Sequence, residues 1–241
     1  MRIIADVHGA AEALRRVTTV PGPLLILGDL INFIDYRTNE GIVTDVSGRE
    51  FTDRMVELRT AGEAVAAGAL WRDFRKGREA ELQQAYDSAI TAAYDEIMGA
   101  LEGSERYVTY GNVDRPNLLR DKMPEGSRYV DGEALDIEGV RVGFAGGGIT
   151  SIGTAGEVTE QEMAAKLDQI GAVDMLCTHV PPAVRALHKD VIGGRPKGSQ
   201  AVLDYIHRRQ PRWHYFGDVH QPQAWTWRIA TTLCRNVGYF R

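Results

Sequence analysis

The chain has 241 residues, and its 33 acidic and 28 basic side chains give a formal net charge of −5 at pH 7. This balance argues against a nucleic-acid-binding protein that depends on a broad basic surface. A composition of 44% hydrophobic and 25% charged residues is ordinary for a globular protein, and no apolar run approaches the ~20 residues of a membrane span.

The first 29 residues predict a β-α-β unit. Residues 2–5 form a short strand-like run, residues 10–17 a short helix, and the apolar run 24–27 a second, buried strand that ends at Gly28-Asp29. Such a unit implies an α/β fold with a parallel sheet whose exit loops gather at one edge.

A long interval then separates Asp29 from the next strand. Residues 35–50 are polar and turn-rich, with no clear element, whereas 51–101 has a helical pattern. Gly77 either separates two helices or lies within one long helix. This helical insertion is open to three interpretations: a cap over the site, a dimer surface, or an insertion packed on its own chain.

The remaining pattern predicts one α/β domain over residues 1–241, without repeats or linkers. Gly146-Gly147-Gly148 is not followed by a helix, so it lacks the context of a phosphate-binding loop and predicts a tight turn instead. Ser199 is a candidate N-cap. The expected elements are a strand at 106–110, a hairpin at 135–144, a helix at 160–170, strands at 174–177 and 213–216, a helix from 199 to 207, and one or two strands within 224–240.

Five polar motifs follow the strand-like runs. Any one of them is ordinarily loop chemistry, but five in this arrangement indicate a metal site. Carboxylate, imidazole and amide donors suit Mn, Fe, Mg or Zn better than an ion that seeks thiolates. The motifs are Asp6-Val7-His8, Gly28-Asp29, Gly111-Asn112-Val113-Asp114, Thr178-His179 and Gly217-Asp218-Val219-His220.

This series resembles the pattern of the calcineurin-like metallophosphoesterases, which runs D-x-H, G-D, G-N-H-(D/E), (G)-H, G-H-x-H and here spans residues 6 to 220. The resemblance implies a four-layer α/β/β/α sandwich and a two-metal centre at the strand ends. Asp29 would bridge both ions, and two divalent ions, with Mn, Fe or Mg favoured over Zn, would be the cofactors. The implied ligands are Asp6, His8 and His220 for the first metal, and Asn112, His179 and Asp218 for the second.

The sequence departs from that pattern in three places. Val113 replaces the histidine that the family is thought to use on the leaving group, a contribution typically worth 10²–10⁴-fold. Asp218 replaces a ligand histidine, and whether this shorter, anionic side chain reaches the second metal is left open. Thr178 replaces a glycine, while the neighbouring His179 imidazole is retained.

The segment 187–197 is basic and glycine-rich, and it lies between a ligand-bearing loop and a helix start. His188 is therefore a candidate replacement acid. Arg195 and Lys197 are candidate contacts to a phosphate group. A solvated surface loop is the competing interpretation.

The leading hypothesis is a metal-dependent phosphodiesterase in which a metal-bridging hydroxide attacks phosphorus in line, with Asp29 and Asn112 as catalytic residues. Its partner would be a small phosphate ester or a nucleotide. The alternatives are a catalytically weakened scaffold of the same fold, and a phosphomonoesterase. No G-x-S-x-G elbow and no P-loop motif is present, which disfavours a serine hydrolase and a P-loop NTPase.

The expected location is the cytoplasm. Cys177 and Cys234 are too few for a disulfide scaffold, and both lie in apolar strand-like segments, so we expect buried, reduced thiols. Residues 1–5 lead straight into the first motif and leave no room for a signal peptide. We expect no membrane partner; a homodimer through residues 51–101 is a further expectation.

Overall fold

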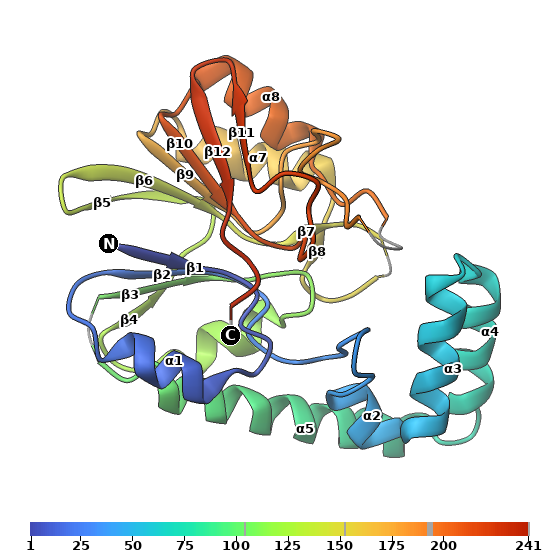
Figure 1. The fold of residues 1–241 in the computed structure, drawn as a ribbon. Coiled ribbons are helices and arrows are strands. Elements are labelled where there is room, and N and C mark those ends of the chain that lie inside the picture. Colours follow the sequence, from blue (N-terminus) through green and yellow to red (C-terminus); the bar gives the residue numbers. More distant parts are fainter. Residues whose placement is uncertain (104, 152, 192–194, 241) are drawn as a thin grey trace.

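A computed structural model describes residues 1–103, 105–151, 153–191 and 195–240. The chain has a mixed α/β fold with two main sheets (Figure 1). The first sheet is parallel and has the order β1 (Arg2–Ile4), β2 (Leu24–Leu27), β3 (Arg106–Thr109), β4 (Ser127–Tyr129). The second is mixed and has the order β11 (Thr226–Ile229), β12 (Thr232–Asn236), β10 (Trp213–Phe216), β9 (Met175–Thr178), β6 (Val140–Ala145), β5 (Glu133–Ile137).

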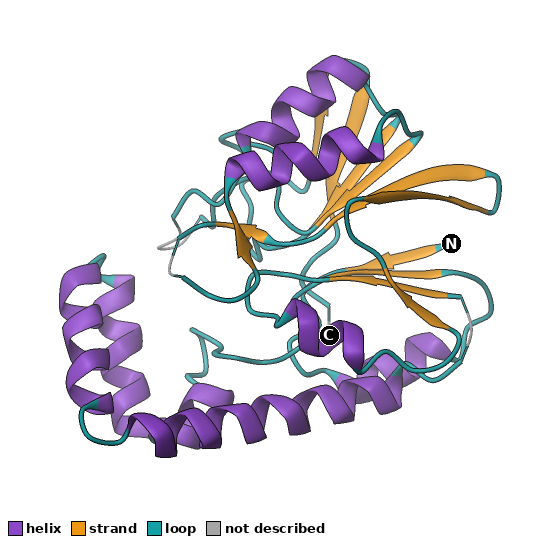
Figure 2. Cartoon of the chain, turned by 180° about the vertical axis from the view of Figure 1, so that it is seen from behind, coloured by secondary structure: helices purple, strands orange, loops and turns teal. Residues whose placement is uncertain are grey.

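Helices cover the outer face of each sheet, as Figures 1 and 2 show. Helices α1 (Ala11–Thr18) and α5 (Glu79–Ala100) lie against the first sheet, and α7 (Glu160–Ile170) and α8 (Gln200–Arg209) against the second. A third apolar cluster, with Leu25, Leu27 and Phe144 among its members, joins the inner faces of the two sheets. This packing fixes the carboxyl ends of both sheets next to each other.

The predicted elements of the main body are largely confirmed. The β5–β6 hairpin pairs Glu133 with Phe144, and the side chain of Ser199 accepts a hydrogen bond from the Val202 N–H at the start of α8. Helix α6 (Pro116–Asp121) and strand β4 were not predicted. Two short strands, β7 (Gly148–Ile149) and β8 (Glu157–Val158), form a small parallel pair.

The helical insertion begins earlier than the predicted residue 51. Residues 35–50 contain α2 (Ile42–Ser47) and the start of α3 (Arg49–Thr60), which the turn-rich composition concealed. Helix α4 (Ala64–Arg75) follows, and Gly77, with φ of 77°, separates it from α5.

The apolar stripe of the insertion packs within the insertion. The Phe51 ring lies 4.1 Å from the Phe74 ring and 5.5 Å from the Trp71 ring, and Trp71 lies 5.8 Å from Tyr86 of α5. The α3–α4 hairpin projects beyond the sheets, on the side to which the carboxyl ends of β1–β3 point (Figure 1). Packing against its own chain therefore accounts for this stripe, and the dimer surface stays a prediction.

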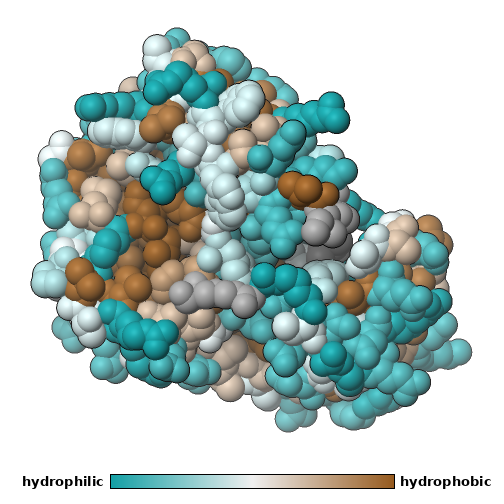
Figure 3. All heavy atoms as spheres, in the orientation of Figure 1, coloured by the Kyte–Doolittle hydropathy of each residue, from teal (hydrophilic) through white to brown (hydrophobic). Residues whose placement is uncertain are grey.

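The surface in Figure 3 is mostly hydrophilic over the helices, while apolar side chains reach the surface on the side where the two sheets open. Half-buried Ile3, Leu135 and Trp213 belong to the cluster between the sheets. Among the described residues, none of the helices has the length and apolar character to cross a membrane. Cys177 and Cys234 are both buried and unpaired, as predicted.

Candidate metal centre

The five polar motifs lie on loops that leave the carboxyl ends of five strands. Asp6 and His8 follow β1, Asp29 follows β2, and Asn112 follows β3 in the first sheet; His179 follows β9, and Asp218 with His220 follows β10, in the second. The crevice outside the carboxyl ends of parallel strands is where α/β folds bind ligands. In this protein the exit loops of both sheets meet in one such crevice.

The backbone of this place is strained. Asp6, His8, Asp29 and Asp218 have φ values of 56°, 43°, 50° and 65°, in the left-handed region that costs a non-glycine residue about 1–3 kcal/mol. Four of the predicted ligands thus adopt a left-handed backbone conformation that is rare for residues other than glycine. Gly28, with φ of 90°, has space for no side chain, because a Cβ there would lie 2.3 Å from the Gly111 nitrogen.

The first half-site contains Asp6, His8 and His220. The Nε2 atoms of the two imidazoles are 3.2 Å apart, and suitable donor atoms of all three side chains lie within 4.8 Å of one another. Burial lowers the pKa of both histidines, that of His220 to about 2, so both rings are neutral, as a metal ligand must be.

The second half-site is organised around His179. Its Nδ1–H donates to the Leu27 carbonyl oxygen at 2.8 Å, which fixes the ring and leaves Nε2 directed at the site, as outer partners of metal-binding histidines do. The Nε2 atom lies 3.2 Å from Asn112 Oδ1 and 3.5 Å from Asp29 Oδ1. Glycine at position 148 leaves room for the Asn112 side chain, since a Cβ there would lie 2.6 Å from the Asn112 Cβ.

Asp29 faces both half-sites with different oxygens. Its Oδ2 lies 3.8 Å from His8 Nε2 and its Oδ1 lies 3.5 Å from His179 Nε2. The Val113 backbone N–H donates to Oδ1 at 3.1 Å. Separations of this size between donor atoms are those of ligands that surround a common ion at about 2.0–2.3 Å. A bridging carboxylate needs this two-sided arrangement.

The site carries excess negative charge. Burial and the charge of Asp29 outweigh the opposing effect of His179 and raise the pKa of Asp6 to about 7. Burial alone would lower the pKa of His179, but Asp29, Asp218 and Asp6 outweigh it and raise that pKa to about 9. The metal-free cluster therefore retains protons that a buried divalent cation would replace.

Asp218 lies at the edge of the second half-site, with Oδ1 4.0 Å from His179 Nε2. The same oxygen accepts a hydrogen bond from the Lys197 ammonium at 2.7 Å, and the Asp218 carbonyl accepts another at 2.6 Å. Lys197, predicted to contact phosphate, thus reaches the site and pairs with a predicted ligand. The Asp218 N–H in turn donates to Asp6 Oδ1 at 3.0 Å.

Asp114 is buried, and its carboxylate connects the loop after β2 with the loop after β3. Its carboxylate accepts from the N–H groups of Leu30 and Gly111 and from the Tyr94 hydroxyl at 3.0 Å. Burial and Asp29 together raise the pKa of Asp114 to about 6. Through Tyr94, helix α5 of the insertion takes part in holding the loops that carry Asp29 and Asn112.

His188 and Arg195 are the predicted site residues with the least structural support. Burial lowers the pKa of His188, which favours its neutral form, and among the described residues no hydrogen bond joins its imidazole to the ligands. Arg195 is exposed. Residues 192–194 of the predicted substrate-lining segment lie outside the described residues. Both roles stay predictions.

Sequence reasoning missed the aromatic neighbour of the first half-site. The Tyr239 ring centre lies 4.4 Å from that of His220 and 5.3 Å from that of His8, and the Arg37 guanidinium lies 4.6 Å from the Tyr239 ring. Neither residue belongs to a motif, and nothing local in the sequence indicates this contact between the two ends of the chain.

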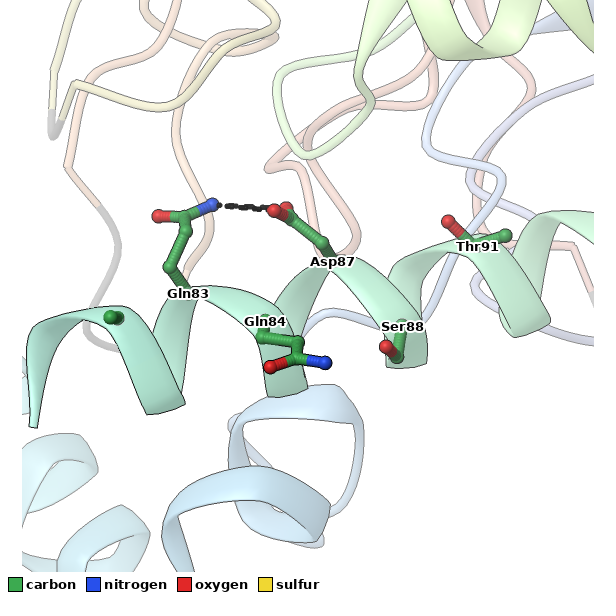
Figure 4. A pocket seen from close by; sticks show the side chains of 6 residues that line it. Gln83, Gln84, Asp87, Ser88 and Thr91 are labelled. Atoms are coloured by element: carbon green, nitrogen blue, oxygen red, sulfur yellow. Dashed lines mark hydrogen bonds between the residues drawn. The ribbon is translucent and has the colours of Figure 1, made fainter.

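Two hollows at the surface of the described residues are lined by side chains other than the ligand candidates. One of about 550 Å³ runs along α5, where Gln83, Asp87 and Thr91 are among the lining residues and Gln83 donates to Asp87 (Figure 4). Asp87 also pairs with Arg115, next to Asp114. A second, of about 660 Å³, is lined by residues of α7 and α8.

No protein-family model matches the sequence, and no curated protein matches it either. Two solved structures are similar over nearly the whole chain. The first has a TM-score of 0.58 and 13% identity, covering 99% of this chain and 90% of its own. The second, TT1561 of Thermus thermophilus, has a TM-score of 0.52 and 13% identity, covering 97% of this chain and 86% of its own. The chain shares their fold. Identity this low carries no statement about activity.

Proposed function

We propose that this protein is a metal-dependent phosphoesterase that acts on phosphodiesters. The observation that carries the proposal is the two-sided arrangement of Asp29, whose oxygens lie 3.8 Å from His8 Nε2 and 3.5 Å from His179 Nε2. With the motif series, this arrangement favours the four-layer sandwich and binuclear centre of the calcineurin-like metallophosphoesterases. The substrate would be a small phosphate ester or nucleotide, and the buried thiols favour the cytoplasm.

The donor set fits two hard divalent ions. Asp6, His8 and His220 would hold one ion, His179 and Asn112 the other, and Asp29 both; the oxygen-rich set favours Mn, Fe or Mg. Bound there, such ions would supply an acidified water as the nucleophile and would stabilise the charge that develops on the phosphoryl oxygens.

The chain's own residues add positioning and charge. Asn112 presents a neutral oxygen, so its amide nitrogen remains able to hold a phosphoryl oxygen. Val113 offers a backbone N–H to Asp29 and a side chain that cannot protonate a leaving group. Substrates with good leaving groups, such as activated diesters, therefore suit the site better than unactivated monoesters.

A catalytically weakened scaffold is the second candidate. The specific observation in its favour is the Lys197–Asp218 pair, which uses a second-half-site carboxylate for an ion pair. A phosphomonoesterase is the third candidate, and it has no structural observation that favours it over the diesterase.

Hydrolysis of bis(4-nitrophenyl) phosphate and of 4-nitrophenyl phosphate by the Mn-loaded protein separates the three. The proposal predicts turnover of the diester, with the monoester slower, and loss of both in Asp29→Asn. Asp45→Asn, on α2, is the control. A Mn-loaded protein that hydrolyses neither compound supports the scaffold, and faster turnover of the monoester supports the phosphatase.

A further inference from the structure

The two half-sites differ in the direct contacts that they make with lysine and arginine side chains. Among the described residues, hydrogen bonds and ion pairs connect no lysine or arginine to the side chains of Asp6, His8 or His220. At the second, the Lys197 ammonium lies 2.7 Å from Asp218 Oδ1 and 2.6 Å from the Asp218 carbonyl oxygen.

The Asp218 carboxylate is buried, with 4% of its side chain exposed, whereas the Lys197 side chain is 36% exposed. A buried carboxylate without a partner is costly, because its loss of hydration is not compensated. Lys197 provides that compensation from the loop that precedes α8. The distance of 2.7 Å between the ammonium and Asp218 Oδ1 makes the two side chains an ion pair.

The oxygen that Lys197 binds is the one nearest to the second half-site, since Asp218 Oδ1 lies 4.0 Å from His179 Nε2. An ion held by His179 and Asn112 would either share Asp218 Oδ1 with the Lys197 ammonium or bind without Asp218 as a ligand. Two cations at one buried oxygen repel each other, and at a few ångströms this repulsion is worth several kcal/mol at the effective dielectric of a protein site.

We propose that Lys197 is a built-in cation of the second half-site, so that the protein binds one divalent ion tightly and a second one weakly. The inference rests on the proposed metal centre and deepens it. Lys197 is a positioning and affinity-setting residue: it holds Asp218 and supplies a positive charge at the Asp218 oxygen that lies 4.0 Å from His179 Nε2.

Metal stoichiometry tests this, with Mn(II) as the probe and the full chain stripped by a chelator. Calorimetric titration of the wild type is expected to show one tight site and a second at least about tenfold weaker. The electron paramagnetic resonance spectrum at one equivalent is then that of isolated Mn(II). In Lys197→Met the second site tightens about tenfold or more, and a spin-coupled signal appears at two equivalents.

Three further variants make the test specific. Lys197→Arg keeps the positive charge, so the two sites should still differ in Mn(II) affinity. Lys189→Met changes an exposed position on the same segment and should leave both affinities unchanged. Asp218→Asn keeps the ammonium but removes its counter-charge, so its second site weakens further. Opposite effects at positions 197 and 218 would not follow from a general loss of structure, which circular dichroism checks.

Two equally tight Mn(II) sites in the wild type, or an unchanged or weaker second site in a folded Lys197→Met, would overturn this inference and leave the phosphoesterase proposal standing. A protein that binds no Mn(II) in any variant would overturn both.

Discussion

The imidazoles of His8 and His220 face each other through their Nε2 atoms at 3.2 Å, although 212 residues separate them in the sequence. They come from the exit loops of β1 and β10, that is, from different sheets. Burial lowers the pKa of both rings, so at most one hydrogen can lie between the two nitrogens. A divalent cation would accept the lone pairs of both.

Replacing His220 by alanine is expected to weaken the tight site more than about 100-fold, beyond the 10–100-fold typical of losing an outer partner of a ligand. Mn(II) at 100 times its dissociation constant should raise the free energy of unfolding of the wild type by about 2.7 kcal/mol. The variant should gain less than about 0.4 kcal/mol at that concentration. Urea unfolding with and without Mn(II) measures this, with the exposed His207→Ala as control. Equal stabilisation of wild type and His220→Ala would place the ion elsewhere.

The sequence was sufficient to predict which side chains gather at the strand ends. Short apolar runs that stop at glycine or a polar motif mark the strands, and the parallel arrangement then determines that their exits meet. Donor atoms of Asp6, Asp29 and His179 indeed lie within 4.8 Å of one another. The insertion boundaries were less predictable, because the short helix α2 has no periodic stripe long enough to be recognised.

The partners of the ligands could not be predicted. Lys197 was identified as a basic residue near the site, but its bond to Asp218 depends on how the loop before α8 crosses the exit of β10. Tyr94 is a buried residue of α5, and its hydroxyl donates a hydrogen bond to Asp114. Both contacts depend on tertiary packing and leave no local pattern.

Tyr94→Phe tests the link between the insertion and the ligand loops. The change removes a hydroxyl that donates to buried Asp114 and accepts from the Arg115 N–H at 2.8 Å. We expect a loss of about 1–3 kcal/mol in the free energy of unfolding, because a buried carboxylate loses a donor. Tyr107→Phe is the control, since its hydroxyl has no hydrogen-bond partner among the described residues. A loss equal to that of the control would show that the Tyr94 hydroxyl is dispensable.

Val113→His tests why the site favours good leaving groups. The histidine of the family pattern would stand at this position, where Val113 is half-buried beside Asn112. A histidine at position 113 should speed hydrolysis of diesters with poor leaving groups by up to about 10²-fold, the lower end of the range for general acid catalysis. The hydrolysis rate of activated diesters should change little. Val113→Gln, which carries no transferable proton, is the control. The same acceleration for both classes of diester would contradict this account of selectivity.

His214 makes the stability depend on pH outside the metal centre. It is fully buried, its Nδ1 has no hydrogen-bond partner among the described residues, and its Nε2 lies 2.9 Å from Thr178 Oγ1. Burial lowers its pKa from 6.5 to about 3. The unfolded chain therefore binds a proton that the folded chain refuses, so this contribution to stability is complete above pH 6.5 and is lost as the pH falls toward 3.

The expected loss from His214 between pH 7 and pH 5 is about 2 kcal/mol in the free energy of unfolding. His214→Gln cannot gain that proton. Urea unfolding at the two pH values should show that the wild type loses about 2 kcal/mol more than this variant, whatever the other acidic groups contribute to both. Equal losses would mean that His214 is protonated in the folded protein.

We expect the exit loops of the two sheets to hold a divalent cation together. Anomalous diffraction at the manganese edge, from crystals grown with Mn(II), tests it most directly. A strong peak is expected roughly 2.0–2.3 Å from the Nε2 atoms of His8 and His220 and from a carboxylate oxygen of Asp29, with a weaker second peak beside His179. Crystals saturated with Mn(II) that show no peak among these side chains would contradict it.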